Sequence, residues 1–267
     1  MGDIPRRTLR SGELPAGLSR ALEGDLVTAL GRGEIEVLFQ PQFSCADGRM
    51  VGAEALARWQ HPTLGEIGAR DLFHIAEKAH LVAPLSRQVV AQAMQQASQW
   101  PEHLGLALNI TPEELAERSF AQDFASGIGR SNIAPSRLTL EITEDVLLRD
   151  LDLAAEALAA LRHIGLRVAL DDFGAGFCNF RYLKELPLDA IKLDRSMVVG
   201  ICRDERDLAV LRAIVGLAHA MGLEVVAEGI ETEAQRDAVI AEGCSYWQGF
   251  LRAAPMRNDD MLRMARG

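Results

Sequence analysis

The sequence of 267 residues predicts an α/β fold, specifically a modified TIM (β/α)8 barrel with an antiparallel first strand. Three observations support this prediction. Apolar runs of the length of strands recur along the chain, most of these runs alternate with helical patterns, and only a short turn separates the first run from the second. Such barrels take roughly 250 residues, so one domain accounts for most of the chain. We expect residues 1–18, rich in Pro and Gly, to be an N-terminal linker or tail, and residues 19–267 to form the domain.

The apolar runs are spaced along the whole chain. They fall near 35–40, 50–58, 104–110, 138–143, 166–171, 188–193, 223–228 and 245–248. Strands of a β-sandwich would recur about every 8–12 residues. Most of the intervals here are longer and have room for a helix, which favours parallel strands with helical crossovers.

Amphipathic patterns predict helices in several of these intervals. They span Arg70–His80, Ser86–Gln99, Asp150–His163, Glu205–Ala220 and Glu233–Ala241. Gly165, Gly222 and Gly243 stand two positions after the ends of three of them, where a left-handed C-terminal cap favours glycine. Pro112, followed by two glutamates, indicates the start of a further helix.

The first two strands are joined differently. Between Phe39 and Val51 the chain has only a short stretch containing Asp47-Gly48. A parallel connection needs a crossover of a dozen or more residues, so these strands are predicted to form an antiparallel hairpin.

Composition excludes several classes of protein. The formal charge of −10 argues against binding DNA or RNA polymers or an anionic membrane, since those partners need a basic surface. No apolar run approaches the roughly 18 residues of a membrane helix, and no secretory leader is apparent. Cysteine and histidine show no metal-binding spacing. We therefore expect a soluble, cytoplasmic domain without membrane contact, in which any metal is held by oxygen.

Polar side chains stand at or near the ends of successive predicted strands. Glu54, Asn109, Glu141 and Asp171 provide oxygen ligands, which Mg²⁺ and Mn²⁺ prefer, and Asp172 would allow a second ion to bind nearby. Each acid taken alone could equally cap a helix or pair with a surface arginine. The whole ordered set is much harder to explain in that way, so it predicts a metal site at the rim of the barrel.

Three further residues belong to this series. Lys192 stands in an apolar strand, where a lysine needs a partner; it could instead extend its ammonium to solvent or form a structural ion pair. Glu228 follows a run of valines and could bind the second ion or accept a proton. Gln248 could hydrogen-bond a nucleobase, although a single glutamine at a rim is often merely solvated.

Seven motifs carry a family resemblance. They are Glu54-Ala55-Leu56-Ala57-Arg58-Trp59, Asn109-Ile110-Thr111, Glu141-Ile142-Thr143-Glu144, Asp171-Asp172-Phe173-Gly174, Ile191-Lys192-Leu193-Asp194, Ala227-Glu228-Gly229-Ile230-Glu231 and Gln248-Gly249. In type and order they resemble the EAL-domain cyclic di-GMP phosphodiesterases, from about Ala21 to about Met256. A single Glu-Ala-Leu tripeptide would mean nothing, whereas the ordered set is specific.

The resemblance implies a role for each residue of the site. Two Mg²⁺ or Mn²⁺ ions would be held by Glu54, Asn109, Glu141, Asp171, Asp172 and Glu228. The resemblance places Lys192 beside the attacking water, and Lys192 or Glu228 would handle the proton. It gives the contacts with cyclic di-GMP to Gln40, Glu54, Leu56, Arg58, Asn109, Asp172, Asp194, Glu231 and Gln248, with Arg58 gripping a phosphate. Glu144 would anchor the loop after Asp172.

The resemblance also implies the activity. The domain would hydrolyse cyclic di-GMP to linear 5′-pGpG by in-line attack of a hydroxide between two metal ions, and it would form a homodimer. Two departures from the family pattern occur: Cys178-Asn179 replaces the usual serines of a regulatory loop, and Glu66-Ile67-Gly68-Ala69 lacks the usual proline. We expect activity with altered regulation.

Two alternatives remain open at this point. The first is a non-catalytic cyclic di-GMP receptor that signals through partner contacts, against which the full set of acids argues. The second is a barrel enzyme of a different class, in which lysine and metal abstract a proton from a carbon acid. Product analysis distinguishes all three.

Overall fold

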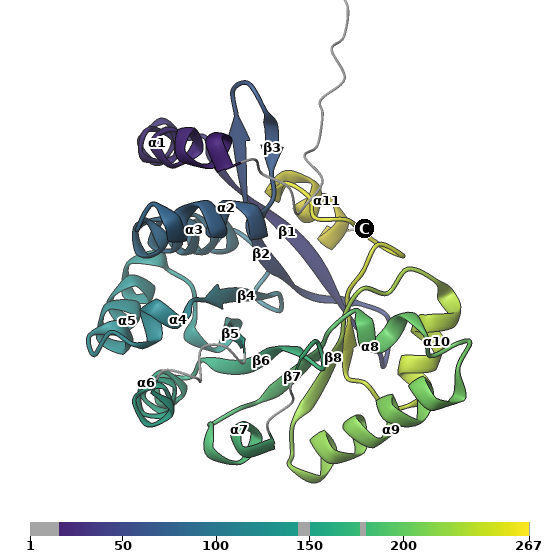
Figure 1. Cartoon of the computed structure of the whole chain (residues 1–267). Coiled ribbons are helices and arrows are strands. Elements are labelled where there is room, and N and C mark those ends of the chain that lie inside the picture. The colour runs from purple at the N-terminus through teal and green to yellow at the C-terminus, as the bar shows by residue number, and fades with distance from the viewer. Residues whose placement is uncertain (1–15, 144–149, 177–179, 267) are drawn as a thin grey trace, which may run out of the picture.

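The structure is a computed structural model that describes residues 16–143, 150–176 and 180–266 (Figure 1). Its strands form one sheet in the order β1-β9-β8-β7-β6-β5-β4-β2-β3, and β1 also pairs with β2, which closes eight of the described strands into a barrel. The strands are β1 (Ile35–Ser44), β2 (Met50–His61), β3 (Gly65–Ile67), β4 (Gly105–Ile110), β5 (Leu138–Thr143), β6 (Arg167–Phe173), β7 (Ala190–Leu193), β8 (Glu224–Ala227) and β9 (Tyr246–Trp247). The predicted modified barrel is confirmed.

The first strand runs against both of its neighbours. β1 pairs antiparallel with β2 and with β9, whereas β2, β4, β5, β6, β7, β8 and β9 follow one another in parallel register. The short turn before Met50 therefore forms the predicted hairpin. β3 lies outside the barrel and extends β2 by a second antiparallel pairing.

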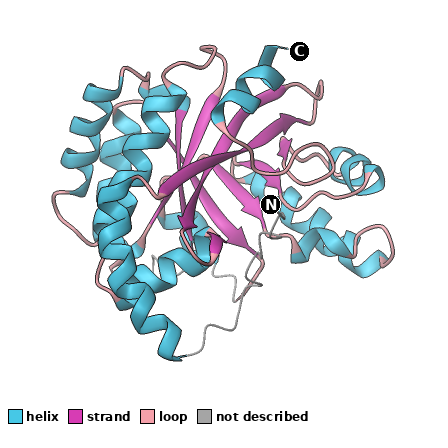
Figure 2. Cartoon of the chain, turned by 90° about the horizontal axis from the view of Figure 1, so that it is seen from above, coloured by secondary structure: helices cyan, strands magenta, loops and turns pink. Residues whose placement is uncertain are grey.

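Helices surround the strands on the outside (Figure 2). They are α1 (Ala16–Arg32), α2 (Ala69–Lys78), α3 (Val82–Ala97), α4 (Pro112–Leu115), α5 (Phe120–Ser131), the 3-10 helix η1 (Pro135–Arg137), α6 (Leu151–His163), α7 (Phe180–Glu185), α8 (Ser196–Val199), α9 (Glu205–Ala220), α10 (Glu233–Ala241) and α11 (Asn258–Arg266). α9 and α10 have the predicted bounds, and the other three predicted helices shift by one to four residues. α1 begins at Ala16, so it includes the last residues of the segment predicted as a linker.

The predicted glycine caps are confirmed. Gly165, Gly222 and Gly243 follow α6, α9 and α10 with φ values of +105°, +74° and +93°. Each ends its helix in the left-handed region, where glycine has no side chain to clash. The next strand can therefore begin directly behind the helix.

Strand periodicity separates an apolar outer layer from a polar interior. On β5, Leu138, Leu140 and Ile142 are fully buried beneath the helices, while Thr139 and Glu141 line a cavity of about 410 Å³ within the barrel. Other residues at this cavity are small, including Ala169 and Ala190. The barrel interior therefore leaves room for long polar side chains.

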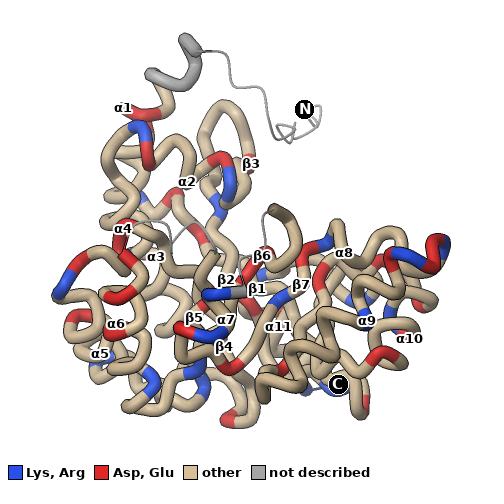
Figure 3. Tube along the Cα trace, turned by 60° about the horizontal axis from the view of Figure 1, so that its bottom comes forward, with Lys and Arg blue, Asp and Glu red and all other residues tan. Residues whose placement is uncertain are grey.

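Charges of both signs are spread along the trace (Figure 3). Within the part of the chain that the structure describes, no helix has the length and apolar character needed to cross a membrane.

Candidate metal and phosphodiester site

Lys192 is at the centre of the site. Its ammonium Nζ lies 2.7 Å from Glu228 Oε1, 2.9 Å from Glu141 Oε2, 3.0 Å from Asp171 Oδ1 and 3.3 Å from Glu54 Oε2. The side chain is 1% exposed. The buried lysine that the sequence predicted to need a partner thus has four carboxylate partners among the described residues.

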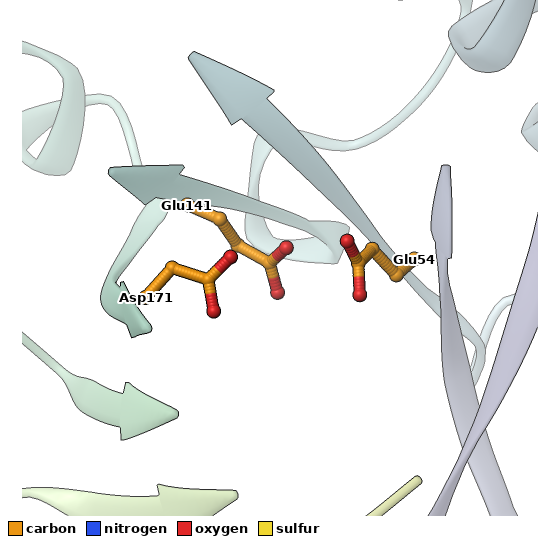
Figure 4. Close-up of side chains that lie close together, drawn as sticks. All are labelled: Glu54, Glu141 and Asp171. Atoms are coloured by element: carbon orange, nitrogen blue, oxygen red, sulfur yellow. The ribbon is translucent and has the colours of Figure 1, made fainter. Parts of the chain in front are cut away.

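Different strands bring these groups together. Glu54 comes from β2, Glu141 from β5 and Asp171 from β6, and their carboxylates face one another in Figure 4. One oxygen of each lies within 4.8 Å of the others. Lys192 extends from β7, and Glu228 follows β8, held by a hydrogen bond from its backbone N–H to Leu193 O. The parallel strands therefore bring residues that are far apart in the sequence into one cluster.

Amide side chains hold the carboxylates. Asn109 Nδ2 donates to Glu54 Oε1 at 2.9 Å, which leaves its own Oδ1 available for an ion. Gln248 Nε2 donates to Glu54 Oε2 at 2.8 Å and to Glu228 Oε1 at 3.1 Å. Gln42 Nε2 in turn donates to Gln248 Oε1 at 3.0 Å.

The pKa shifts within the cluster agree with an excess of acidic over basic groups around Lys192. Burial, then repulsion by the neighbouring carboxylates against the attraction of Lys192, raises the pKa of Glu141 well above its usual range and that of Glu228 to about 8. Burial acts in the same direction on Glu54, but Lys192 and the hydrogen bonds from Gln248 and Asn109 hold its pKa below its usual range. Burial would lower the pKa of Lys192, yet its acidic neighbours raise it well above normal.

This donor set fits divalent cations. One ammonium faces four carboxylates, so the cluster carries more negative than positive charge when all are ionised. Glu141 Oε2 is close to Lys192, yet it is buried without a hydrogen-bond partner in the described part of the molecule. Carboxylate and amide oxygens in this number suit Mg²⁺ or Mn²⁺.

Asp172 lies beside the cluster with an unusual backbone. Its φ is +53°, and its N–H donates to Asp171 Oδ1 at 2.9 Å. Its carboxyl group is only partly withdrawn from solvent, and this partial burial, followed by repulsion from Asp171, raises its pKa. This left-handed turn exposes Asp172 while Asp171 stays buried, so the pair presents one carboxylate to the interior and one to the rim.

The predicted phosphate-binding arginine lies farther out on β2. Arg58 Nε is 3.6 Å from Glu66 Oε1 on β3, and Arg58 Nη1 donates to Ala57 O. Leu56, two positions before Arg58, lies on the same face of the strand. Gln40 of β1 pairs with Glu54 of β2. Leu56 and Arg58 therefore continue outward along the face of β2 that carries Glu54, and Gln40 lies level with Glu54 on β1.

Other predicted residues lie at the edge or outside the described chain. Asp194 Oδ1 accepts a hydrogen bond from Ser196 N, and Glu231 pairs with Arg195 at 2.8 Å on the surface. Gln248, predicted at the rim, is 3% exposed and turned toward the carboxylates. Glu144, Cys178 and Asn179 lie outside the described residues.

Sequence reasoning missed Gln42 and Glu66 as residues of the site. Gln42 stands two positions after Gln40 on the same strand, so the period of two is the signal that would have found it. Glu66 lies on β3, and the three residues of this strand are too few to show a strand pattern in the sequence. No sequence signal therefore placed Glu66 beside Arg58.

A family model described as the EAL domain matches residues 23–255. The chain is 39% identical over 245 residues to cyclic di-GMP phosphodiesterase PA2567 of Pseudomonas aeruginosa, covering 89% of this chain and 42% of that protein. It is 35% identical over 268 residues to cyclic di-GMP phosphodiesterase RocR of the same organism, covering 99% of this chain and 67% of RocR. It spans only 28% and 29% of two other curated relatives.

A solved structure has the same fold. The PaMucR phosphodiesterase in complex with c-di-GMP superposes with a TM-score of 0.85 and 34% sequence identity, over 91% of this chain and 100% of that one. The EAL enzyme Bd1971, in a form with cAMP and cyclic di-GMP bound, gives a TM-score of 0.87 at 27% identity, over 92% of this chain and 69% of that one.

Proposed function

The chain belongs to the EAL domain family, and on that premise we propose that it hydrolyses cyclic di-GMP to linear 5′-pGpG by a two-metal-ion mechanism. The observation that carries the proposal is the cluster of four carboxylates around buried Lys192. Relatives named as cyclic di-GMP phosphodiesterases support the choice of substrate.

The metal-binding residues in this proposal come from strands β2, β4, β5 and β6 and from the residue after β8. They are Glu54, Asn109, Glu141, Asp171, Asp172 and Glu228. Bound divalent cations would lower the pKa of water and neutralise charge on the phosphoryl oxygens. The protein fixes the position of the Glu54 carboxylate, and with it the place where a cation can bind, because Asn109 and Gln248 donate hydrogen bonds of 2.9 Å and 2.8 Å to it.

Lys192 and Glu228 are the proposed catalytic pair. Nζ of Lys192 is a donor at the centre of the carboxylates, positioned to orient a water molecule or stabilise a phosphate oxygen. Glu228, with its pKa raised to about 8 by burial and by its acidic neighbours, holds a proton more readily than an ordinary carboxylate. Glu228 can take the proton from the attacking water when it is ionised, whereas Lys192 is an ammonium with a raised pKa and can take it only after passing its own proton to a neighbouring carboxylate. The proposal leaves open which of the two residues acts.

Substrate recognition is assigned to the face of β2 and the surrounding rim. Arg58 would bind a non-reacting phosphate oxygen, since a guanidinium offers paired donors. Gln40, Leu56, Asp194, Glu231 and Gln248 complete the proposed contacts, together with Glu54, Asn109 and Asp172. A homodimer, a cytoplasmic location and a domain of residues 19–267 are further parts of the proposal, supported by the family resemblance.

The test is to incubate the protein with cyclic di-GMP and Mg²⁺ or Mn²⁺ and to separate the nucleotides by chromatography. We expect linear pGpG, its loss with a chelator, and a rate decrease of more than about a hundredfold in Glu54→Gln, because even residues behind metal ligands contribute 10–100-fold. The control is Glu156→Gln, the same change on the exposed face of α6.

The outcomes separate the candidate functions. Saturable binding of cyclic di-GMP without cleavage would replace the enzyme with a receptor. Metal-dependent proton loss from a carbon acid, with no phosphodiester cleavage, would indicate a different barrel enzyme.

A further inference from the structure

Gln42 contacts the site from the antiparallel strand. It lies on β1 opposite Gly52 of β2, so no side chain faces it across that pair. The following residue, Phe43, pairs with Trp247 of β9, and an antiparallel ladder continued by one residue places Gln42 opposite Gln248. Gln42 also lines the cavity inside the barrel. Backbone register thus brings the two glutamines together on the inner face.

The two amides form a chain of hydrogen bonds with one direction. Gln42 Nε2 donates to Gln248 Oε1 at 3.0 Å, and Gln248 Nε2 donates to Glu54 Oε2 and Glu228 Oε1 at 2.8 Å and 3.1 Å. A Gln248 amide turned by half a rotation would set its oxygen against two carboxylates. Electrostatic repulsion excludes that orientation, so the oxygen of Gln248 must face Gln42 and requires a donor there.

We propose that Gln42 is a positioning residue that fixes the amide of Gln248 and, through it, the carboxylates of Glu54 and Glu228. Gln248 is buried, and Gln42 is the one hydrogen-bond partner of its Oε1 among the described residues. A donor at position 42 keeps both N–H groups of Gln248 directed at the two acids. This inference rests on the proposed function for its metal site and its cleavage assay, and Mn²⁺ affinity and cleavage are measured separately.

Two substitutions of similar size separate positioning from packing. Gln42→Met keeps the volume and removes the donor, whereas Gln42→Glu keeps the shape and presents an acceptor to Gln248 Oε1. We expect Gln42→Glu to weaken Mn²⁺ binding by about tenfold or more and Gln42→Met by less, since partners behind metal ligands are worth 10–100-fold. Calorimetric titration with Mn²⁺ measures both.

Matched controls exclude a general loss of structure. Gln95→Glu makes the same chemical change at an exposed position of α3 and should bind Mn²⁺ like the wild type. In a Gln248→Met background, Gln42→Met should add little, because the residue through which it acts is gone. Raising Mn²⁺ should restore cleavage by Gln42→Glu, which a packing defect would not show.

The results distinguish this inference from the proposed function. Wild-type Mn²⁺ affinity in both Gln42 variants, with cleavage intact, would overturn the positioning role and leave the function standing. Weakened Mn²⁺ binding in Gln42→Glu, together with a wild-type protein that does not cleave cyclic di-GMP, would support the positioning role and overturn the function. Equal losses in the Gln248→Met background would also overturn the inference.

Discussion

A single lysine organises the charges of the site. Lys192 is expensive to bury, and the structure offsets that cost with carboxylates from strands β2, β5 and β6 and from the residue after β8. Its apolar neighbours in the sequence indicated burial and a need for partners. Which acids would contact it depended on parallel register, which no local pattern contains.

Replacing Lys192 by methionine tests this arrangement. With a chelator present, we expect Lys192→Met to lower the free energy of unfolding by about 3–5 kcal/mol, because the carboxylates lose their buried partner. Mn²⁺ should raise the thermal midpoint of the variant more than that of the wild type. Lys184→Met, at an exposed position of α7, is the control. Equal stability of Lys192→Met and wild type in chelator would contradict the account.

At the scale of elements, segments with an apolar or periodic pattern of their own were predictable, and segments without one were not. The eight strands and helices α9 and α10 follow from their own apolar patterns. β3 has three residues and exists because β2 provides an edge for pairing. α5 contains Gly127 and Gly129, which weaken an intrinsic helical signal. Tertiary contacts, absent from local sequence, decide such elements.

Helix α4 begins with a reciprocal cap that carries a buried acid. Glu114 Oε2 accepts hydrogen bonds from Ser86 Oγ at 2.8 Å and from Thr111 N and Oγ1. Burial raises the pKa of Glu114 above its ordinary value of 4.5, with the hydrogen bonds acting in the opposite direction. Between the two values the folded state binds more protons than the unfolded chain, so stability falls as pH rises through that window.

Glutamine at position 114 can keep the acceptor without the charge. We expect the free energy of unfolding of Glu114→Gln to lack this decrease with pH, and Glu114→Ala to lose about 1–2 kcal/mol through the missing cap. Denaturant unfolding across the window measures both. The same pH slope in wild type and Glu114→Gln would contradict the prediction.

Gly249 permits two backbone segments to cross behind Gln248. Ile230 N donates to Gln248 O at 3.1 Å and Leu251 N donates to Ile230 O at 2.9 Å, and a side chain on Gly249 would overlap the backbone of Ile230. We expect Gly249→Ala to lower both thermal stability and activity, because it displaces Gln248.

Gly216 offers the control for that substitution. It lies in α9, with open space where a Cβ would stand. Gly216→Ala should leave activity unchanged and raise stability by up to about 1 kcal/mol, through helix propensity. Full activity in Gly249→Ala would contradict the role assigned to the crossing.

At the scale of the whole molecule, the barrel contains a cavity of about 410 Å³. Barrels of this class are generally filled by branched apolar side chains, whereas small residues such as Ala107, Ala169 and Ala190 line the cavity here. The ordered motifs predicted the acids, but the cavity and the inward turn of Gln248 arise only when the strands close. The acidic residues of the cluster were therefore predictable from the sequence, and the hydrogen bonds that support them were not.

The proposed activity requires this cluster to direct a water molecule onto a phosphodiester. The most direct measurement is cleavage of cyclic di-GMP in heavy-oxygen water with Mn²⁺, followed by mass spectrometry of the products of wild type and Glu141→Gln. The account predicts linear pGpG with one heavy oxygen in its terminal phosphate, and the loss of this product in the variant. Saturable binding with no labelled product, or equal cleavage by Glu141→Gln, would contradict it.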